Sequence, residues 1–247
     1  ISSDGSNTEN ILDRQNKGNG INTSIQSLIN EISLGGHYFK IGLLYRETNI
    51  INGILFNSEV WYGLLKKEIE ALEKIDETFM RQLFGAPSKT PIEAFYLESG
   101  KVPLRFIIQN RRLMYWWHLV RTGEDKMLHK FYKAQKNMPV KKDWTTQVEQ
   151  DKKDLGIDLM DEDIKGMSKY KFKKFLKKKI NTAALLYLNK LKNKHTKVEN
   201  LQSKELKCSN YLQNKLFSKN EVQLLFKFRT RMYAVKENFP SMYENAN

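Results

Sequence analysis

Helical spacing of apolar residues is the feature that most constrains what this chain can fold into. In its clearest segments, apolar side chains recur three and four residues apart, which places them on one face of an α-helix. No alternating run of convincing length, the pattern of a half-buried strand, occurs in the 247 residues. No repeat of solenoid period is present. The sequence therefore predicts an all-α fold, with a multi-helix bundle followed by a basic helical region.

Start and stop residues divide this pattern into separate predicted helices. The predicted segments are 8–33, 37–47, 64–84, a helix entered at 90–93, 103–122, 169–194 and 219–236, with shorter polar helices or loops at 144–156 and 158–165. Residues 50–62 are rich in apolar side chains but ambiguous in type. In the first segment, Gly18 and Gly20 predict a break or kink, because each costs about 1 kcal/mol relative to alanine inside a helix. Gly35 and Gly36 are expected to end it.

Three short motifs predict particular helix ends. Gly85 stands where a left-handed C-terminal cap is expected. Thr90 and Glu93 predict a capping box around a proline at the first helical position. Ser218 and Glu221 predict a second capping box at the start of the last helix.

The distribution of apolar residues also predicts which helices are buried. Residues 104–120 are apolar nearly all round, as is typical of a central helix covered on several sides, and Trp116 and Trp117 are interpreted as packing residues. The segment 64–84 has one apolar face, and Glu68 is expected on its solvent side. In the last helix, Leu225 is predicted to face the core.

A soft boundary is predicted near residues 137–142, where Pro139 interrupts the helical pattern. It divides the chain into a helical bundle over 1–138 and a basic helical region over 139–247. The chain begins with Ile1 and a turn-forming cluster at 2–7, as expected for a fragment of a larger mixed protein.

The net charge is strongly positive. Lys and Arg number 42 against 28 Asp and Glu, for a formal charge of +14, and 33 of the 42 are lysines. Lysine is a hydrated point charge suited to phosphate, whereas arginine is the usual bidentate reader of bases. This balance favours a polyanionic partner contacted through its backbone. The alternative is that lysine serves only as a common surface residue.

Most of this charge is concentrated in residues 165–197, which contain twelve lysines and no acidic residue. An apolar stripe follows helical spacing through Phe172, Phe175, Leu176, Ala183, Ala184, Tyr187 and Leu191. The lysines that lie off this stripe are Lys171, Lys173, Lys174, Lys177 and Lys178. Like charges on adjacent turns repel by a few tenths of a kcal/mol per pair, and a counter-anion would relieve this repulsion. We favour contact with a nucleic-acid backbone over a solvated face without a partner.

Two acidic or cationic clusters have further interpretations. Asp161, Glu162 and Asp163 are interpreted as first-turn helix acids that offset the lysines, rather than as ligands of a hard cation. In the last helix, aromatic residues alternate with cations over 226–231. Such a run can stack on bases, but packing in the core is the commoner role of aromatic residues at this spacing.

The sequence offers little support for a catalytic site or a structural metal site. A single cysteine, Cys208, excludes an internal disulfide framework, and four scattered histidines argue against a structural zinc site. No glycine-rich phosphate loop is present. No apolar run approaches the roughly 18 residues of a membrane span, so no membrane partner is predicted. The residues alone indicate a basic helical binding module in an intracellular setting, in nucleus or cytoplasm, rather than an enzyme.

Several phrases resemble a known family. The segment 51–63, INGILFNSEVWYG, is similar to the region that follows the palm of reverse transcriptases encoded by non-LTR (LINE-type) retrotransposons. Residues 1–5 resemble the turn after the primer-grip strand, and Arg14 with Lys17 and the following Gly-Asn-Gly resembles the start of the thumb. Segments 93–100, 107–115 and 225–238 resemble regions further downstream.

This resemblance implies a fold and a role. In that family the thumb is a helical bundle beside the palm of the same polypeptide, and it grips the template–primer duplex by its backbone. The region after the thumb helps to hold the element's RNA or its target DNA. The palm aspartates, which hold magnesium for nucleotide transfer, have no match in this chain, so no catalytic residue and no cofactor is assigned to it.

The predicted function is therefore that of the nucleic-acid-binding, non-enzymatic part of an RNA-directed DNA polymerase. The alternative is a degenerate or host-adopted protein-interaction module with a solvated lysine face. The candidate nucleic-acid-binding residues are Arg14, Lys17, Lys171, Lys173, Lys174, Lys177, Lys178, Arg229 and Arg231.

Overall fold

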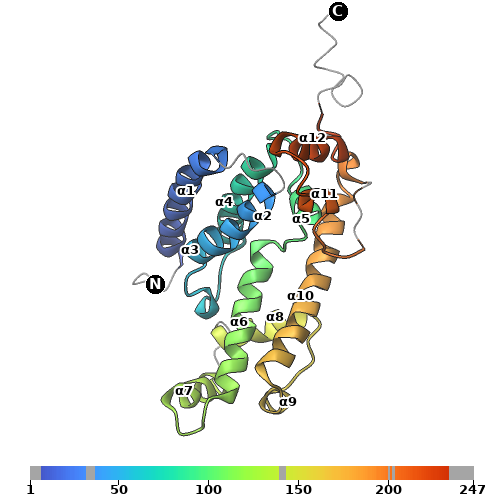
Figure 1. The fold of residues 1–247 in the computed structure, drawn as a ribbon. Coiled ribbons are helices and arrows are strands. Elements are labelled where there is room, and N and C mark those ends of the chain that lie inside the picture. The colour runs from blue at the N-terminus through green and yellow to red at the C-terminus, as the bar shows by residue number, and fades with distance from the viewer. Residues whose placement is uncertain (1–6, 32–36, 139–142, 200, 202–203, 234–247) are drawn as a thin grey trace, which may run out of the picture.

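The computed structural model describes residues 7–31, 37–138, 143–199, 201 and 204–233. Throughout these residues every regular element is helical (Figure 1), which confirms the all-α prediction. The predicted helix stops at Gly35 and Gly36 and the interruption at Pro139 lie outside the described residues. The last helix was predicted to run to residue 236, but it ends at Arg229, and Arg231 already has a positive φ of 51°. None of the described helices is both long enough and apolar enough to cross a bilayer.

The elements follow one another along the chain with short connections. In order they are α1 (Thr8–Glu31), α2 (His37–Tyr45), the π-helix η1 (Arg46–Ile51), α3 (Asn52–Ile54), the 3-10 helix η2 (Ser58–Val60), α4 (Lys66–Phe84), α5 (Ile92–Ser99), α6 (Leu104–Arg121), α7 (Met127–Lys136), α8 (Trp144–Asp154), α9 (Asp161–Lys165), α10 (Lys169–Lys192), the 3-10 helix η3 (Thr196–Val198), α11 (Asn210–Gln213) and α12 (Lys219–Arg229). The ambiguous segment 50–62 is helical as far as Ile54 and then turns into η2.

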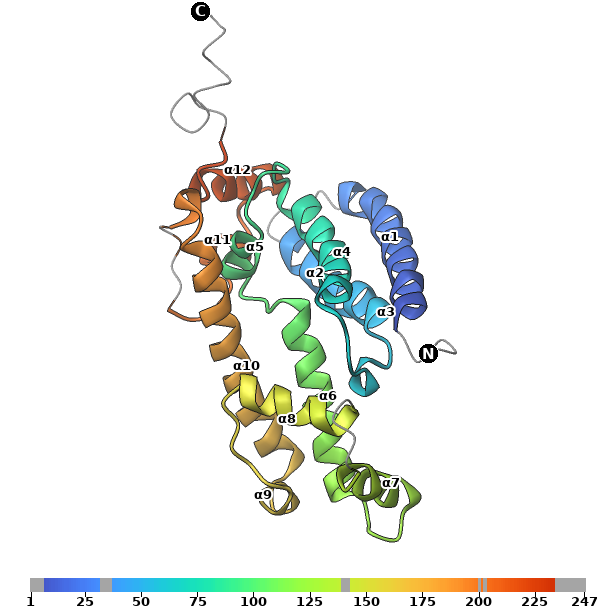
Figure 2. The same ribbon diagram turned by 180° about the vertical axis from the view of Figure 1, so that it is seen from behind.

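Two long helices connect the two ends of the molecule. Helices α1 to α4 lie together in one part, beside α5, α11 and α12, and α6 leads from this part to α7, α8 and α9 at the opposite end (Figures 1 and 2). Helix α10 returns alongside α6 to the first part. The basic helix therefore packs on the helix that the sequence predicts to be central.

Two hydrophobic cores hold these parts together. The first combines α1, α2, α4 and α5 with α12, and its aromatic residues include Phe84, Phe95 and Phe226. The second combines α6, α8 and α10 around Trp116 and Phe172. Each core draws residues from both sides of position 138. The division into 1–138 and 139–247 stays a prediction about domains, but the hydrophobic cores do not separate there.

Helix α1 is continuous, so the prediction of a break at its glycines was wrong. A Cβ atom on Gly18 would lie 2.7 Å from Cγ2 of Ile75 in α4 and 2.9 Å from Cγ2 of Ile54 in α3. Glycine at this position allows the helices to approach closely. The packing gained in this way offsets the low helix propensity of the residue.

The capping predictions were partly correct. Ser218 and Glu221 form the expected box at the start of α12, and Gly85 adopts the left-handed conformation that ends α4. The box at α5 was wrong, because Thr90 makes no capping bond and its buried Oγ1 has no hydrogen-bond partner among the described residues. Glu93 is instead buried, with 1 % of its surface exposed. The proline between them takes the N-cap position in its place.

Glu68 was also placed on the wrong side of its helix. It is buried at the start of α4, where its carboxylate accepts hydrogen bonds from the backbone N–H of Leu65 at 2.8 Å and from Oγ1 of Thr8 at 3.1 Å. The residue caps its own helix and holds α1 against it. Capping at a helix N-terminus favours a carboxylate there because of the unsatisfied N–H groups.

A fully buried ion pair lies in the first core and was not predicted. Nε and Nη2 of Arg46 donate to the two carboxylate oxygens of Asp76, each at 2.6 Å, and the Tyr96 hydroxyl donates to the same carboxylate at 2.8 Å. Arg46 and Asp76 are both 0 % exposed. Because both charges are paired, the site is structural, and loss of one partner would leave the other uncompensated.

Candidate nucleic-acid interface

The cap of helix α10 sets where the helix begins, and its buried apolar face turns the lysines toward solvent. The Ser168 hydroxyl accepts a hydrogen bond from the Lys171 N–H at 3.4 Å and caps the helix. The residues of α10 that are buried are Phe172, Leu176, Ile180, Ala184 and Leu188. The predicted stripe is confirmed only in part: it omitted Ile180 and Leu188, and four of its members are only partly buried, namely Phe175, Ala183, Tyr187 and Leu191. The buried face packs against α5 and α6.

The lysine row consists of Lys171, Lys173, Lys174, Lys177 and Lys178, and all five side chains are exposed. None of them forms an ion pair with another described residue. Within the row, Lys174 lies one helical turn from Lys171, Lys177 and Lys178, so the ammonium groups repel one another. The row is a continuous positive face without a counterion from the described part of the protein.

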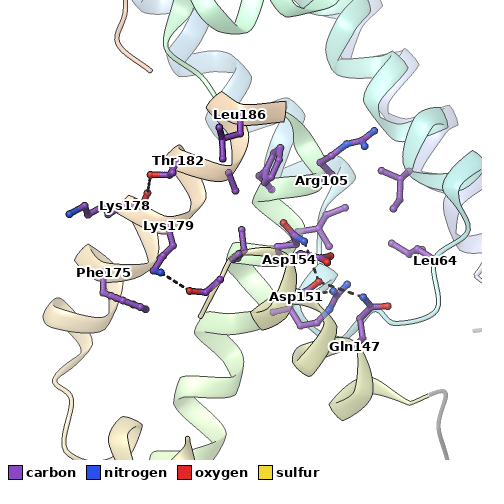
Figure 3. A pocket seen from close by; sticks show the side chains of 18 residues that line it. Leu64, Arg105, Gln147, Asp151, Asp154, Phe175, Lys178, Lys179, Thr182 and Leu186 are labelled. Carbon is purple, nitrogen blue, oxygen red and sulfur yellow. Dashed lines mark hydrogen bonds and ion pairs between the residues drawn. The ribbon is translucent and has the colours of Figure 1, made fainter. Parts of the chain in front are cut away.

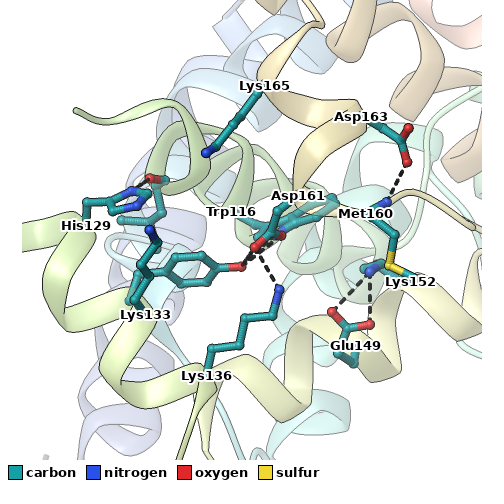
Figure 4. Close-up of polar contacts among 12 residues, drawn as sticks. Trp116, His129, Lys133, Lys136, Glu149, Lys152, Met160, Asp161, Asp163 and Lys165 are labelled. Carbon is teal, nitrogen blue, oxygen red and sulfur yellow. Dashed lines mark hydrogen bonds and ion pairs between the residues drawn. The ribbon is translucent and has the colours of Figure 1, made fainter. Parts of the chain in front are cut away.

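The acidic residues at the start of α9 do not neutralise the lysine row. Asp161 accepts a hydrogen bond from Nζ of Lys136 at 2.7 Å, from the Tyr132 hydroxyl at 3.0 Å and from Nε1 of Trp116 at 3.1 Å (Figure 4). Burial acts to raise the pKa of Asp161, but Lys136 and these donors outweigh burial and lower it. Burial of the Tyr132 hydroxyl raises the pKa of Tyr132, and the negative charge of Asp161 raises it further. The three acids lie in the first turn of α9, as predicted. Asp161, however, pairs with Lys136 and not with a member of the lysine row.

This polar network positions the start of the basic helix. It joins α6, α7 and α9, and α9 directly precedes α10 (Figure 4). Asp163 caps α9 by accepting the Met160 N–H at 2.8 Å. Lys165 and Lys133 both approach the exposed carboxylate of Glu124, at 3.3 and 3.4 Å. These two lysines have partners within the protein, unlike those of the lysine row.

The candidate residues of α12 are held by the protein itself. Arg229 donates to the buried carboxylate of Glu98 through Nε at 3.0 Å and Nη2 at 2.9 Å, which ties α12 to α5. Arg231 lies 3.6 Å from Glu199 in an exposed ion pair. Arg229 is therefore a structural residue first, although 43 % of its side chain remains exposed.

The aromatic residues of α12 have two different roles. Phe226 is completely buried between Phe84 and Phe95, so the core interpretation is confirmed for this residue. Phe228 is 54 % exposed and stacks on Tyr233 with ring centroids 4.6 Å apart. Leu225 is only partly buried, so the prediction that it faces the core was wrong by one position.

The candidate residues of α1 lie at a third place. Nη1 of Arg14 donates to the Gly53 carbonyl at 3.4 Å, and its guanidinium lies 5.6 Å from the centroid of the Phe56 ring. Lys17 is exposed one turn further along. Helices α1 and α12 and the lysine-bearing half of α10 lie well apart in both views (Figures 1 and 2). The structure thus brings the five lysines together and leaves the arginines and Lys17 at other places.

A large cleft adjoins α10 and was not predicted from the sequence. Its volume is about 940 Å³, and it lies between α4, α6, α8 and α10 (Figure 3). It is lined by Leu64, Ile69, Arg105, Phe106, Ile108, Gln109, Arg112, Gln147, Asp151, Asp154, Leu155, Gly156, Phe175, Lys178, Lys179, Thr182, Ala183 and Leu186. Its lining comes from residues between 64 and 186, which no single segment of the sequence brings together.

Charged groups in this cleft are mostly paired. Nη1 of Arg112 lies 2.5 Å from the Asp151 carboxylate, and its Nε donates to the Trp61 carbonyl at 2.9 Å. Burial raises the pKa of Asp151, although Arg112 acts against that shift. Arg105 is held by Glu73 at 2.5 Å. Both side chains of the Arg112–Asp151 pair are buried, and those of the Arg105–Glu73 pair are partly buried.

No cluster of three or more histidine, cysteine, aspartate or glutamate side chains that could hold a metal ion occurs in the described part of the chain. Cys208 is half-buried, and burial raises its pKa above the ordinary thiol value. Comparisons with models of protein families, with curated proteins and with solved structures found no match to this chain.

Proposed function

We propose that this chain binds nucleic acid by its phosphate backbone, through the lysine row of α10. The observation that carries the proposal is the exposure of five adjacent lysines that have no ionic partner among the described residues. A phosphate backbone supplies the missing anions, and release of its condensed counterions drives binding without regard to base sequence. Lysine, as a hydrated point charge, suits such contacts better than it suits base recognition.

The sequence resemblance supplies the wider setting. We propose that the chain is the thumb and the following helical region of a non-LTR retrotransposon reverse transcriptase, where it would hold a template–primer duplex, the element's RNA or the target DNA. The polymerase reaction would belong to the palm of the same polypeptide, whose aspartates bind magnesium. In this setting, Arg14 and Lys17 would contact the nucleic acid at a separate place from the lysine row. Arg229 and Arg231 are already paired with carboxylates of the protein, so only their exposed parts would contact the nucleic acid.

Charge reversal in the lysine row tests the proposal. Lys174→Glu with Lys177→Glu should weaken binding of any duplex sequence at least tenfold, because each lost phosphate contact removes a counterion-release step. Folding should be unaffected, since both side chains are exposed.

The matched control reverses two exposed lysines elsewhere, Lys67→Glu with Lys89→Glu, and lowers the net charge by the same amount. Fluorescence anisotropy with a labelled duplex measures both variants. Equal weakening in the two double variants would show that only the overall charge matters, and unchanged affinity in the first would mean that the lysine row is a solvated face.

A surface on α7 favours the second candidate, a protein-interaction module. Met127 and Phe131 are each 66 % exposed, one turn apart, while His129 and Tyr132 on the other side of the helix are buried. Exposed apolar side chains of this size are typical of contact sites. If charge reversal in the lysine row left nucleic-acid affinity unchanged and Phe131→Asp abolished binding to a protein partner, the second candidate would replace the first.

A further inference from the structure

We infer that the cleft between α6, α8 and α10 receives unpaired nucleobases of a strand whose phosphates follow the lysine row. This inference rests on the proposed function and narrows it, since it assigns single-stranded segments as the preferred ligand. The cleft and the row belong to neighbouring faces of one helix, and Lys178 takes part in both.

Helical geometry places the cleft directly beside the cations. Phe175, Lys179 and Thr182 lie three or four residues apart and line the cleft, and Lys171 and Lys178 occupy the adjacent row of the helix. The ammonium of Lys178 is directed away from the cleft, whereas Lys179 reaches across it to the Gly156 carbonyl oxygen at 2.5 Å (Figure 3). A strand along the outer row would therefore carry its bases at the mouth of the cleft.

The size and lining of the cleft suit a nucleobase, which is a flat aromatic ring with polar groups at its edge. Its volume of about 940 Å³ falls within the roughly 300–1,000 Å³ of small-molecule sites. Phe175 offers a partly exposed ring, and Leu186 is 67 % exposed on the same wall. Gln147 and Thr182 supply amide and hydroxyl groups at the edges. Bases stack on aromatic side chains with little regard to sequence, because every base has a π-face.

Charge in the cleft also favours a nucleotide. Arg112 is neutralised by Asp151, and Arg105 by Glu73 outside the lining. Inside the cleft, Lys179 and Asp154 then leave no net charge, and the outward ammonium of Lys178 places positive charge at the rim, where a phosphate would lie.

Bases of a duplex cannot use this cleft. They are stacked and paired inside the helix, and extrusion of one costs a few kcal/mol. Unpaired bases are free to turn toward a protein surface. The cleft therefore distinguishes single strands from duplexes, whereas the lysine row contacts the backbone of both.

Abasic nucleotides provide the direct test, because they keep every phosphate and remove only the base. Two strands of equal length, one normal and one abasic at several central positions, release the same number of counterions on binding. If bases enter the cleft, the wild-type chain should bind the normal strand at least about fivefold more tightly, the smallest effect expected for one stacked base.

A substitution at the mouth of the cleft should remove this difference. Thr182→Met narrows the cleft with a side chain that offers no aromatic ring, at an exposed position whose hydroxyl bonds to the Lys178 carbonyl of its own helix. The control is Asn193→Met, an exposed position at the end of α10 that does not line the cleft. Circular dichroism and the melting temperature establish that both variants are folded.

The outcomes separate this inference from the proposed function. A preference for the normal strand that disappears in Thr182→Met, with duplex affinity unchanged, supports the inference. Equal binding of normal and abasic strands by the wild type overturns it, and so does a preference that survives in Thr182→Met. The proposed function fails separately, if Lys174→Glu with Lys177→Glu leaves the affinity for both the single strand and the duplex unchanged.

Discussion

Charged side chains in this protein fall into those fixed by an internal partner and those that face solvent without one. Arg46, Arg112 and Arg229 belong to the first kind, because each is paired with a buried carboxylate. The lysine row belongs to the second. An exposed ion pair contributes little to stability, and a buried pair is costly to break. Charge reversal in the row should therefore affect binding, whereas removal of a paired arginine should affect folding.

Glu93 is a buried carboxylate with an incomplete set of partners, and it predicts a pH dependence of stability. Its Oε1 accepts no hydrogen bond from the described residues, and Nε2 of His195 lies 3.7 Å from that oxygen. Burial raises the pKa of Glu93 above the ordinary value of 4.5, although His195 acts in the opposite direction. The folded state thus keeps the proton to a higher pH than the unfolded chain does. Stability is lost as the pH rises from 4.5 through the raised pKa.

Glu93→Gln should therefore raise the free energy of unfolding at pH 7, since it removes the buried charge. The gain should shrink as the pH falls through the raised pKa, and it should vanish below 4.5, where the wild-type carboxyl group carries its proton in both states. Urea denaturation at several pH values measures the effect, with the exposed Glu70→Gln as control. A loss of stability of the same size at pH 7 and at pH 5 would contradict this account of Glu93.

At the scale of the elements, Phe226 is the largest apolar side chain that α12 places in the first core. Phe226 contacts Phe84 and Phe95 with ring centroids at 4.4 and 5.5 Å, and it is completely buried. Phe226→Ala should cost about 3–5 kcal/mol of stability, the usual range for a buried phenylalanine. Leu225→Ala, at the neighbouring and partly exposed position, should cost less than about 2 kcal/mol. Chemical denaturation compares them, and equal losses would mean that the helix is rotated from the orientation described here.

Local signals account for the elements that could be predicted. The apolar residues predict α4, α6 and α10, because the pattern that identifies each of these helices lies within its own sequence. Ser218 and Glu221 predict the start of α12 for the same reason. The all-α class follows from these elements and from the absence of strand patterns.

The role of a residue whose partner lies far away in the sequence could not be predicted in the same way. Gly18 suggests a break until Ile54 and Ile75 are known to lie against it. Arg229 resembles a free cation until Glu98, far away in the sequence, is placed beside it.

The candidate site shows the same division between local and distant information. The lysine row could be predicted with its five residues, because one amphipathic helix determines both its apolar and its basic face. The cleft could not, since it combines residues from 64 to 186 on four elements. Helix α8 packs against α6, and the cleft lies between these helices, α4 and α10. No sequence motif specifies that arrangement.

At the scale of the whole molecule, the cations are spread over several surfaces, and the five lysines of the row are exposed together without an ion pair to any described residue. The lysine row lies on the half of α10 next to α8 and α9, away from α1 and α12 (Figures 1 and 2). A nucleic acid bound there would leave the first core and its surface uncovered. The formal charge of +14 would assist association over a distance, and the row would determine where the backbone rests.

The dependence of duplex affinity on salt concentration tests this central claim most directly. The slope of log affinity against log salt is about −0.9 for each phosphate contact on duplex DNA, so five engaged lysines should contribute roughly −4 to −5. Lys174→Glu with Lys177→Glu should flatten the slope by about two contacts, close to 1.8, while Lys67→Glu with Lys89→Glu should leave it as in the wild type. An identical slope in all three proteins would contradict the account, because it would place the phosphate contacts somewhere other than on the lysine row.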